Sequence, residues 1–568
     1  MRARRHRGRT ALAATVGTGV NAFGGGASAF GGGGKALGGG PNVFGGGPRV
    51  WPTRTARLTR RCDAATFGPM RLEVGGARGS AARAGRIAKA FGSAAIALAA
   101  VGWLGCRANV ELASSGGTTG GAGGAGARCA TPDAACAAFP PAAWARLLGG
   151  SNGNGRAVAL DAAGRVFATG IFSGSADLGS GPIVAQGAHA AYVVAWGPGG
   201  DVLWTRAFDG VTDVMAAVTE ASGVYVVGLA DGAVDFGGGP RCAAGAGTQR
   251  FLLKLDMAGK HLWSTCLGDA NVRPGEPGVT RLAADAAGGV VFSADFVGSV
   301  DFGTGPVQVG ALGSSAVAKR SASGVPVWTR VFSSVGGFVA ISSVAVGPDG
   351  SVYVVGRANG TIDLGGGPLT TADYYGDAFL AKLDANGEPL WSKVFPSPKT
   401  ETDLKDVAVD GSGRCVIGGE AWIPVDFGCG LQTPQGDAGS AFVASFEGSG
   451  APRWSRLFAG SATVAMAVDV DGTIALLTEA YDGTDFGCGP VAAGASWGLM
   501  LLRLDAAGRA LGDTSLGIMP PSLDFGVAAR DGVIVVTGQR TPDGSYPSEI
   551  DGASVTGTGA AYAVLMRP

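Results

Sequence analysis

Val234-Asp235-Phe236-Gly237-Gly238-Gly239-Pro240 is the stretch of sequence that decides the fold, because variants of it recur at regular spacing. Consecutive copies are separated by 58, 66, 62, 63 and 59 residues. The copies begin at Asp177, Asp235, Asp301, Asp363, Asp426 and Asp485. A period of about 60 residues indicates one structural unit per copy, so this part of the chain is a repeat array.

Two hairpin patterns flank each copy of the motif, and the fourth unit shows them most clearly. Residues 343–350 and 351–356 form two alternating apolar runs that meet at a glycine turn. Residues 378–384 and 390–395 form a second pair around the turn at Asn386. Four short strands per unit predict one four-stranded antiparallel sheet, which is the blade of a β-propeller.

The number of units and their ends predict how the array closes. First hairpins begin at Ala157, Met215, Arg281, Ser343, Asp406, Ala465 and Asp524. The seventh unit stops after its third strand, whereas the run that begins at Trp144 matches the fourth strand of a unit and has no unit before it. Placing that run beside the last unit would cover two open sheet edges. We therefore expect an all-β fold, a seven-bladed β-propeller over residues 139–568 that its own N-terminal strand closes.

The second hairpins end in a Trp-Ser/Thr-Arg/Lys-x-Phe pattern or a close variant of it. Its tryptophans are Trp144, Trp204, Trp263, Trp328, Trp391 and Trp454. A fixed register on the outermost strand favours packing between blades over stacking against a carbohydrate, because a buried aromatic side chain contributes a large apolar surface.

These elements together resemble the bacterial seven-bladed β-propeller (SBBP-type) repeat over residues 144–568. The matching parts are the hairpin of the form VxVDxxGxVYVxG, the DFGGGP loop and the second hairpin that ends in tryptophan. The second hairpin is also similar to the quinoprotein-type repeat, in which a D-x-x-G-x-x-x-W pattern docks tryptophans between blades. The resemblance implies a propeller fold and assigns no activity.

The N-terminal part of the chain is typical of targeting sequence. Residues 1–69 are rich in arginine and in glycine tracts, so we expect them to be disordered, with Met70 as an alternative start. Residues 70–105 combine basic residues, a short apolar run and a small-residue end, which is the layout of a signal peptide. Residues 106–138 are rich in glycine, serine and threonine and predict a flexible tether.

Leu104-Gly105-Cys106 resembles the bacterial lipobox, in which the cysteine becomes the lipidated N-terminus. Trp103 and Leu104 depart from the usual pattern, so ordinary cleavage and an uncleaved anchor remain alternatives. We expect lipidation at Cys106 and a location in the bacterial cell envelope, as an outer-membrane lipoprotein or as a secreted or periplasmic protein.

Export predicts disulfide bonds among the remaining cysteines. Cys129 with Cys136 could close a small loop, Cys242 and Cys266 lie in one repeat, and Cys429 with Cys488 could join neighbouring repeats. Cys415 competes for either of the last two, so the pairing stays open. A metal site is not expected, because no C-x-x-C occurs and few histidines are present.

The distribution of charge excludes one class of partner. Residues 1–90 hold 16 Lys and Arg against two acids, whereas the rest of the chain holds 28 Lys and Arg against 42 acids. An acidic body lacks the clustered positive charge that phosphate binding needs, so we expect no nucleic-acid partner.

No motif for catalysis or for a cofactor stands out. Four strict copies and two variants with leucine make the Asp-Phe-Gly element a structural marker rather than the single magnesium motif of a kinase. The turns that begin at Asp161, Asp256, Asp285, Asp384 and Asp505, and the Asp469–Gly472 turn, predict hairpins, with calcium binding as the alternative. Four carboxylates could line one face, but we do not identify them as catalytic: Glu220, Asp295, Glu420 and Glu479.

The sequence therefore predicts a non-catalytic binding or scaffolding module without a cofactor, monomeric and held at the membrane only by its lipid. The expected partner is an envelope protein or a polysaccharide. One alternative is a propeller enzyme of the lyase, glycosidase or quinoprotein type with an axial active site. Another is a subunit of an envelope assembly machine.

Overall fold

The computed structural model describes part of the chain. The described residues are 56–61, 107–112, 135–137, 139, 142–148, 153–220, 222–242, 248–269, 281–308, 313–364, 367–371, 376–396, 402–434, 439–491, 497–517, 525–539, 549–550, 553–554 and 561–567.

Two compact units divide the chain, Met1–Ala122 and Gly123–Pro568. In the first unit, β1 (Ala56–Arg61) pairs antiparallel with β2 (Arg107–Leu112). The two strands lie within the segments expected to be disordered (residues 1–69) and to form a flexible tether (residues 106–138). An alternation of polar and apolar residues, as in Arg-Ala-Asn-Val-Glu-Leu of β2, has the period of two that suits a strand. The predicted signal peptide and the rest of the tether lie outside the described residues.

The described residues of the second unit form seven four-stranded sheets, which we number as blades 1 to 7 from inner to outer strand. Blade 1 is β4 (Asn154–Leu160), β5 (Val166–Phe172), β8 (Ala190–Trp196) and β9 (Val202–Asp209). Blade 2 is β10 (Val211–Glu220), β11 (Gly223–Asp231), β14 (Thr248–Leu255) and β15 (His261–Asp269). Blade 3 is β16 (Leu282–Ala284), β17 (Val290–Phe296), β20 (Ser314–Arg320) and β21 (Pro326–Phe332).

The other four sheets follow the same order. Blade 4 is β23 (Val339–Val346), β24 (Val352–Ala358), β27 (Asp377–Leu383) and β28 (Pro389–Phe395). Blade 5 is β29 (Thr402–Val409), β30 (Cys415–Ala421), β31 (Ser440–Phe446) and β32 (Pro452–Ala459). Blade 6 is β33 (Ser461–Val468), β34 (Ile474–Tyr481), β35 (Trp497–Leu504) and β36 (Ala510–Gly517). Blade 7 is β37 (Gly526–Arg530), β38 (Val533–Gln539), β41 (Ala561–Met566) and β3 (Ala142–Leu148).

Short strands accompany the loops that join the second and third strands of the blades. They are β6 (Ser175–Asp177), β7 (Pro182–Val184), β12 (Val234–Asp235), β13 (Pro240–Arg241), β18 (Ser299–Asp301), β19 (Pro306–Gln308), β22 (Ser334–Val335), β25 (Thr361–Asp363), β26 (Pro368–Thr370), β39 (Glu549–Ile550) and β40 (Ala553–Ser554).

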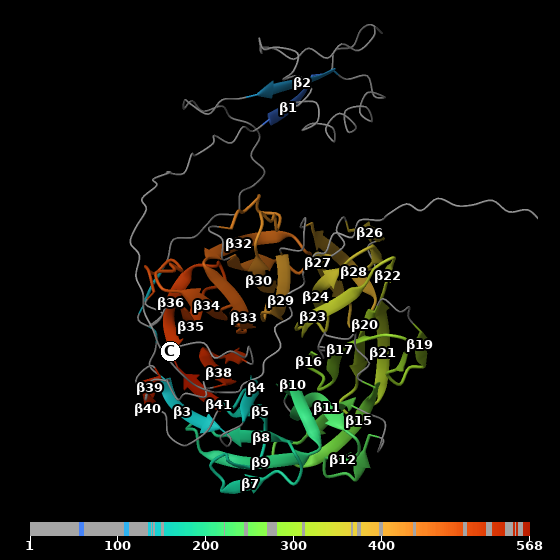
Figure 1. The fold of residues 1–568 in the computed structure, drawn as a ribbon, viewed down its shortest axis with the longest axis vertical. Helices are drawn as coiled ribbons and strands as arrows, with labels where there is room; N and C mark the ends of the chain where they lie inside the picture. Colours follow the sequence, from blue (N-terminus) through green and yellow to red (C-terminus); the bar gives the residue numbers. More distant parts are fainter. Residues whose placement is uncertain are drawn as a thin grey trace, which may run out of the picture. The chain divides into compact units, whose positions relative to one another are not determined.

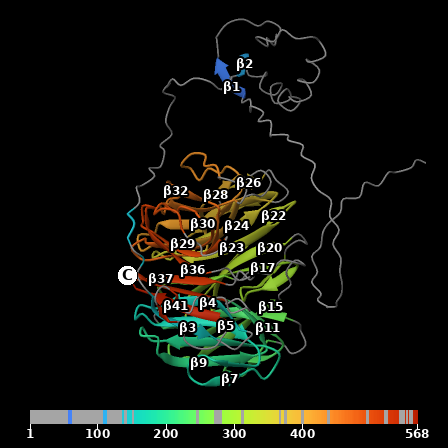
Figure 2. The same cartoon turned by 60° about the vertical axis from the view of Figure 1, so that its left-hand side comes forward.

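The sheets of the second unit lie around a common centre, with their first strands innermost (Figures 1 and 2). Each first strand contacts those of the neighbouring blades, in the order β4, β10, β16, β23, β29, β33, β37 and back to β4. The predicted all-β class, built from antiparallel four-stranded sheets, is confirmed. In blade 7 the strand that contains Trp144 pairs antiparallel with β41, from Ala142 opposite Met566 to Leu148 opposite Ala561.

The core lies between neighbouring blades. All seven residues of β8 are buried, because both faces of this strand pack against another sheet. Tyr192, Val194 and Trp196 belong to one hydrophobic cluster, whereas Ala191, Val193 and Ala195 belong to the next one. A strand buried on both faces is read in the sequence as a continuous apolar run, and this explains why the third strands lack polar alternation.

The recurrent Asp-Phe-Gly loops are held by their aspartates. In five of the loops, one carboxylate oxygen accepts hydrogen bonds from the amides two and four residues later, at 2.7–2.8 Å and 2.9–3.2 Å. The following aromatic ring packs between blades: the Phe236 ring lies 5.4 Å from that of Phe208 in blade 1 and 4.6 Å from that of Phe251 in its own blade. The same oxygen-to-amide pattern holds the turns at Asp256 and Asp384.

Each tryptophan of the outer strands docks on the turn of the next blade. Its indole N–H donates to a turn carbonyl at 2.9–3.2 Å; the pairs are Trp144 with Pro198, Trp204 with Met257, Trp263 with Ala322, Trp328 with Ala385, Trp391 with Gly448 and Trp454 with Ala506. The turn glycine lies under the ring. At Gly387, φ is +81° and a Cβ would be 2.8 Å from the Trp328 ring, so only glycine suits this position.

The junction of blades 6 and 7 lacks such a tryptophan, and a different segment occupies it. The strap, residues 135–137, runs along the outer edge of blade 6, where Ala135 donates to the Ala510 carbonyl (2.9 Å) and Ala137 to that of Leu511 (2.8 Å). Phe139 follows the strap and packs against the hydrophobic cluster that blades 6 and 7 share. Strand addition therefore covers part of an outer edge that would otherwise be open.

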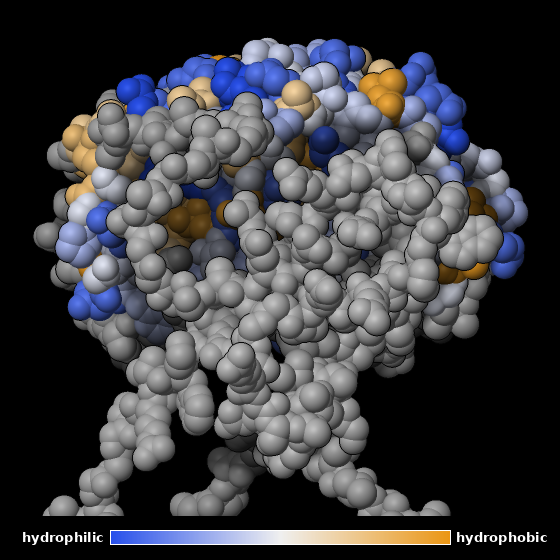
Figure 3. All heavy atoms as spheres, turned by 90° about the horizontal axis from the view of Figure 1, so that it is seen from above, coloured by the Kyte–Doolittle hydropathy of each residue, from blue (hydrophilic) through white to orange (hydrophobic). Residues whose placement is uncertain are grey.

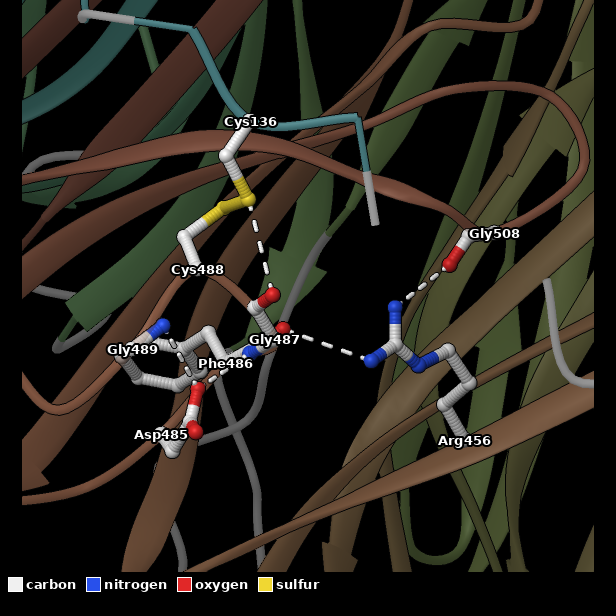
Figure 4. Close-up of a disulfide and its surroundings, with 8 residues drawn as sticks. All are labelled: Cys136, Arg456, Asp485, Phe486, Gly487, Cys488, Gly489 and Gly508. Atoms are coloured by element: carbon white, nitrogen blue, oxygen red, sulfur yellow. Dashed lines mark hydrogen bonds between the residues drawn. A yellow bond between two sulfur atoms is a disulfide. The ribbon is translucent and has the colours of Figure 1, made fainter. Parts of the chain in front are cut away.

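A disulfide fixes the strap to the blade 6 loop. Cys136 is bonded to Cys488, which follows Asp485-Phe486-Gly487 in that loop (Figure 4). Arg456 of blade 5 donates to the Gly508 carbonyl at 2.7 Å and to the Phe486 carbonyl at 3.3 Å (Figure 4). The same short region thus joins the strap, the loop of blade 6 and the outer strand of blade 5.

The observed disulfides correct two of the expected pairings. Cys242 pairs with Cys266 within one repeat, as expected. Cys136 pairs with Cys488, so the pairs Cys129–Cys136 and Cys429–Cys488 do not form. Cys429 is disulfide-bonded, but to none of the other described cysteines, and Cys415 is a buried free thiol. The reason is the course of the strap, which brings Cys136 to the loop of blade 6.

Candidate functional site

Charged side chains occupy the same register position on the second strands of four consecutive blades. They are Asp295 on β17, Arg357 on β24, Glu420 on β30 and Glu479 on β34. Each lies near the end of its strand, opposite a residue near the start of the third strand. The same position holds Ile171 in blade 1 and Leu229 in blade 2.

Three of the four carboxylates that the sequence suggested for one face share this position: Asp295, Glu420 and Glu479. The expectation for Glu220 is wrong. Glu220 ends β10 and is paired with Gly223 beside the first turn, at the opposite end of the blade. The hairpin pattern itself separates these positions, because Glu220 precedes the turn of its hairpin whereas the other three carboxylates follow theirs.

Asp295 joins two blades. Its carboxylate accepts a hydrogen bond from the Ser315 hydroxyl and one from the Ile341 amide of blade 4 at 3.4 Å. The same hydroxyl donates to the Val339 carbonyl at 3.0 Å. These contacts explain Asp295 as a structural link between blades 3 and 4.

The side chains of blades 5 and 6 form a more open arrangement, which we call the blade 5–6 cluster. Its members are Asp403, Lys405, Glu420, Trp422, Glu479 and Tyr481. Asp403 is the cross-strand partner of Glu420, and its carboxylate lies 2.7 Å from the Lys405 ammonium. The Lys405 and Asp403 side chains are 40% and 37% exposed, so this ion pair is in contact with solvent and contributes about 1 kcal/mol or less to stability.

Burial and neighbouring charges shift the pKa values of three side chains in the cluster. Burial raises the pKa of Glu420, a shift that Lys405 opposes and Asp403 increases. Burial also raises the pKa of Glu479, and the charge of Glu420 raises it further. For Lys405, burial acts to lower the pKa, but the charge and the hydrogen bond of Asp403 outweigh it, so the pKa is raised. Perturbed carboxyls on converging strands are typical of functional sites.

An exposed aromatic side chain follows each glutamate. The sequences are Glu420-Ala421-Trp422 and Glu479-Ala480-Tyr481, at the same register in adjacent blades. Trp422 is 52% exposed and acts to lower the pKa of Glu420, and Tyr481 is 50% exposed. Large aromatic side chains are commonly buried when their role is to pack, so two half-exposed rings beside carboxylates indicate a contact surface.

Each ring lies beside a glycine at the junction of the blades, and the two glycines are joined by a backbone hydrogen bond. A Cβ at Gly439, where φ is +74°, would lie 3.0 Å from the Trp422 ring, so glycine permits this contact. The Tyr481 ring lies near Gly460, whose amide donates to the Gly439 carbonyl at 3.3 Å. The Thr463 hydroxyl of blade 6 also donates to the Gly419 carbonyl of blade 5 at 2.9 Å.

A second set of polar side chains lines the centre of the ring. The Ser343 hydroxyl donates to the Asp406 carboxylate at 2.7 Å, and the Met466 amide donates to its other oxygen at 3.2 Å. Arg281 donates to the Ser342 carbonyl at 3.1 Å. Burial raises the pKa of Asp406 and lowers that of Arg281. These bonds connect blades 3, 4, 5 and 6, so this set holds the first strands together.

Sequence reasoning missed four members of the cluster: Asp403, Lys405, Trp422 and Tyr481. A usable signal was present, because Glu-Ala followed by an aromatic residue occurs in two consecutive units at one register. Known catalytic motifs are contiguous patterns in the sequence. The cluster instead combines residues of two repeats, so it becomes visible only when the repeats are aligned.

Other kinds of site receive no support from the described residues. Among them, no group of three or more His, Cys, Asp or Glu side chains could hold a metal ion, and no helix is long and apolar enough to cross a membrane. On the face drawn in Figure 3, hydrophobic residues are scattered among hydrophilic ones.

Comparison with known proteins was made for families, curated proteins and solved structures. No family model and no curated protein matches the chain, so the resemblance to the SBBP-type repeat stays a prediction. Among solved structures, the chain is similar to the Dos1 propeller (11% identity, 75% of this chain and 95% of that one, TM-score 0.37). Streptogramin B lyase is similar at 10% identity, 76% and 96% coverage and TM-score 0.33. The polysaccharide lyase PL25 ulvan lyase has 11% identity, 73% and 97% coverage and TM-score 0.37.

The expectation that the chain is not an enzyme is corrected by this comparison. Two of the similar structures are lyases, and a phage endosialidase is a third enzyme with a similar structure. The absence of a triad or of metal-ligand spacing does not separate this chain from such proteins, because side chains of different blades can meet without forming a contiguous motif. At these identities the similarity concerns the fold and assigns no activity.

The raised carboxyl pKa values predict how stability depends on pH. A carboxyl with a raised pKa binds its proton more tightly in the folded state, so its contribution is fully present below the ordinary carboxyl pKa. That contribution is lost as the pH rises through the raised pKa of the folded state. Because Glu479→Gln removes the titration, we expect its unfolding midpoint relative to the natural chain to increase from pH 4 to pH 8.

Thermal unfolding at a series of pH values measures this difference. Glu447→Gln is the matched control, since Glu447 is 51% exposed beside Arg453 in a turn of blade 5. A Glu479→Gln difference that stays constant across the series would contradict the assigned electrostatics.

Proposed function

We propose that this chain is an exported β-propeller that binds a ligand at the cell envelope through the blade 5–6 cluster. The observation that carries the proposal is the repeated pair of a carboxylate and a half-exposed aromatic ring, Glu420 with Trp422 and Glu479 with Tyr481. Two pairs at one register offer the same chemistry twice along the junction of two blades. A repeated arrangement of this kind suits a ligand that is itself a repeat.

The chemistry of the cluster favours a polysaccharide over a protein as the ligand. Flat aromatic rings pack against the apolar faces of sugar rings, while carboxylates and ammonium groups bind hydroxyl groups. The surface is open to solvent at both rings, and an extended chain can lie across it. A folded protein partner would instead need a broad complementary surface of about 800 Å² on each side.

We also infer that the second unit is a closed seven-bladed ring of the SBBP type. This inference is supported by the pairing of β3 with β41 and by the docking of Trp144 on the blade 1 turn. The side chain of Arg567 adds a bond to the same Pro198 carbonyl at 2.5 Å. Closure fixes the first strands around the centre and so holds β30 and β34 at a constant spacing.

Attachment to the envelope is proposed through a lipid on Cys106. The support is indirect: the disulfides Cys136–Cys488 and Cys242–Cys266 indicate an exported protein, since such bonds persist in oxidising compartments. The N-terminal sequence adds the pattern of a lipoprotein signal.

A second candidate function is cleavage of the bound polysaccharide. It is favoured by the raised pKa values of Glu420 and Glu479, because a raised pKa brings a carboxyl closer to the range in which it can act as a general acid. The lyase and glycosidase alternatives both require such a group. Release of oligosaccharides from a bound polymer distinguishes this function from binding alone.

Removal of the aromatic rings tests the binding function. We expect the Trp422→Ala, Tyr481→Ala double variant to lose roughly tenfold or more in affinity, which corresponds to about 1.4 kcal/mol. The measurement is retention of the purified protein on immobilised neutral, acidic and amino polysaccharides, followed by titration of those that bind. Leu390→Ala is the matched control, because Leu390 is 55% exposed on the outer strand of blade 4. Equal binding by the double variant and the control would overturn the proposed site.

Fractionation of cells tests the lipid anchor. We expect Cys106→Ala to move the protein from the membrane fraction to the soluble fraction, because the acceptor of the lipid is lost. Cys62→Ala, which lies before the predicted signal peptide, is the control and should leave fractionation unchanged. Membrane association of Cys106→Ala at the level of the natural chain would exclude lipidation at this cysteine.

A further inference from the structure

The charges of the blade 5–6 cluster, together with its aromatic rings, indicate the chemical class of the ligand. From its charges and rings together, we propose that the ligand is a glycan with free primary amines, a polymer that contains de-N-acetylated amino sugars. This inference rests on the proposed function and specifies its ligand. Three steps lead to it.

The first step concerns charge. The cluster holds three carboxylates and one lysine, and that lysine lies 2.7 Å from Asp403. Among the described residues, neither Glu420 nor Glu479 forms an ion pair within 4.0 Å, and the second unit as a whole is acidic. Two glutamates of adjacent blades therefore have no cationic partner within ion-pair distance in the described part of the chain, and a bound cation would stabilise their ionised forms.

The second step concerns the rings. Trp422 and Tyr481 lie on the Gly439–Gly460 contact, and both are about half exposed. Each ring is open to solvent and is not enclosed as in the cage that surrounds a methylated ammonium. An exposed aromatic ring suits the broad face of a sugar ring, and the carboxylate two residues before each aromatic residue is available to the substituent of that sugar.

The third step combines the two observations. A sugar stacked on Trp422 or Tyr481 would place a ring substituent toward the neighbouring glutamate. A protonated amine there gains a charge-assisted hydrogen bond, which is about twice as strong as a neutral one. An acetylated nitrogen carries no charge and adds bulk, so the same polymer in acetylated form should bind more weakly.

The test compares two ligands of equal length, glucosamine oligomers and N-acetylglucosamine oligomers. Binding to the full chain is measured by calorimetry at a pH at which the sugar amines are protonated. We expect at least tenfold tighter binding of the glucosamine oligomer. The double variant Glu420→Gln, Glu479→Gln should bind the glucosamine oligomer only as tightly as the acetylated oligomer. Trp422→Ala should weaken the binding of both oligomers. Glu447→Gln should change neither.

A second readout separates charge recognition from simple stacking. Because a bound cation favours the ionised carboxyls, binding should release protons, so the observed heat should depend on the ionisation enthalpy of the buffer. Glu479→Gln should reduce this dependence, whereas Leu390→Ala should leave it unchanged. A heat independent of the buffer would contradict the role of the glutamates.

The outcomes distinguish failure of the ligand class from failure of the site. If both oligomers bind with equal affinity and Trp422→Ala weakens the binding of both, recognition of the amine is overturned and the proposed function stays in place. Binding of lysine oligomers without binding of glucosamine oligomers would overturn the claim that the ligand is a glycan. Binding of any oligomer unaffected by the cluster variants would overturn both the proposed function and its ligand.

Discussion

Docking of an outer-strand tryptophan on a glycine turn of the next blade is the interaction on which this structure depends. Each sheet alone would expose two apolar faces, and only its neighbours can bury them. The indole fixes how the neighbours meet, because its ring packs on the turn while its N–H binds a turn carbonyl. Trp328 on Gly387 shows the constraint: the turn needs a positive φ, and the ring needs the space of a missing Cβ. One residue type satisfies both conditions.

The junction of blades 6 and 7 shows what happens where this interaction is missing. The outer strand of blade 6 has no tryptophan, and the strap with Phe139 occupies its edge instead. The Cys136–Cys488 disulfide then fixes the strap in place. Stability at this junction thus depends in part on a disulfide, a bond that persists in oxidising compartments. The N-terminal segment, expected to be only a tether, takes part in the fold.

The fold could be predicted from the sequence in most respects, whereas the site could not. Repeats about 60 residues long, turns with glycine and tryptophans at one register were sufficient for antiparallel four-stranded sheets, because each feature has a local physical cause. The partner of Cys136 could not be found, since it depends on the path of the strap. Glu220 was expected beside Glu420 because both lie in first hairpins. Glu220 precedes the turn of its hairpin, however, whereas Glu420 follows its turn. Trp422 and Tyr481 were overlooked because their meaning arises only from the alignment of adjacent blades.

The central claim is that tryptophan docking joins each outer strand except that of blade 6 to the next blade, including the strand that precedes blade 1. Trp144 and Trp454 are both 5% exposed, so they are matched in burial. The most direct measurement is the unfolding midpoint in urea of Trp144→Ala beside that of Trp454→Ala. Loss of a buried tryptophan costs about 3–5 kcal/mol, and the account predicts that the two variants lose similar stability. A Trp144→Ala variant as stable as the natural chain, beside a destabilised Trp454→Ala, would show that the N-terminal strand does not dock and would contradict the account.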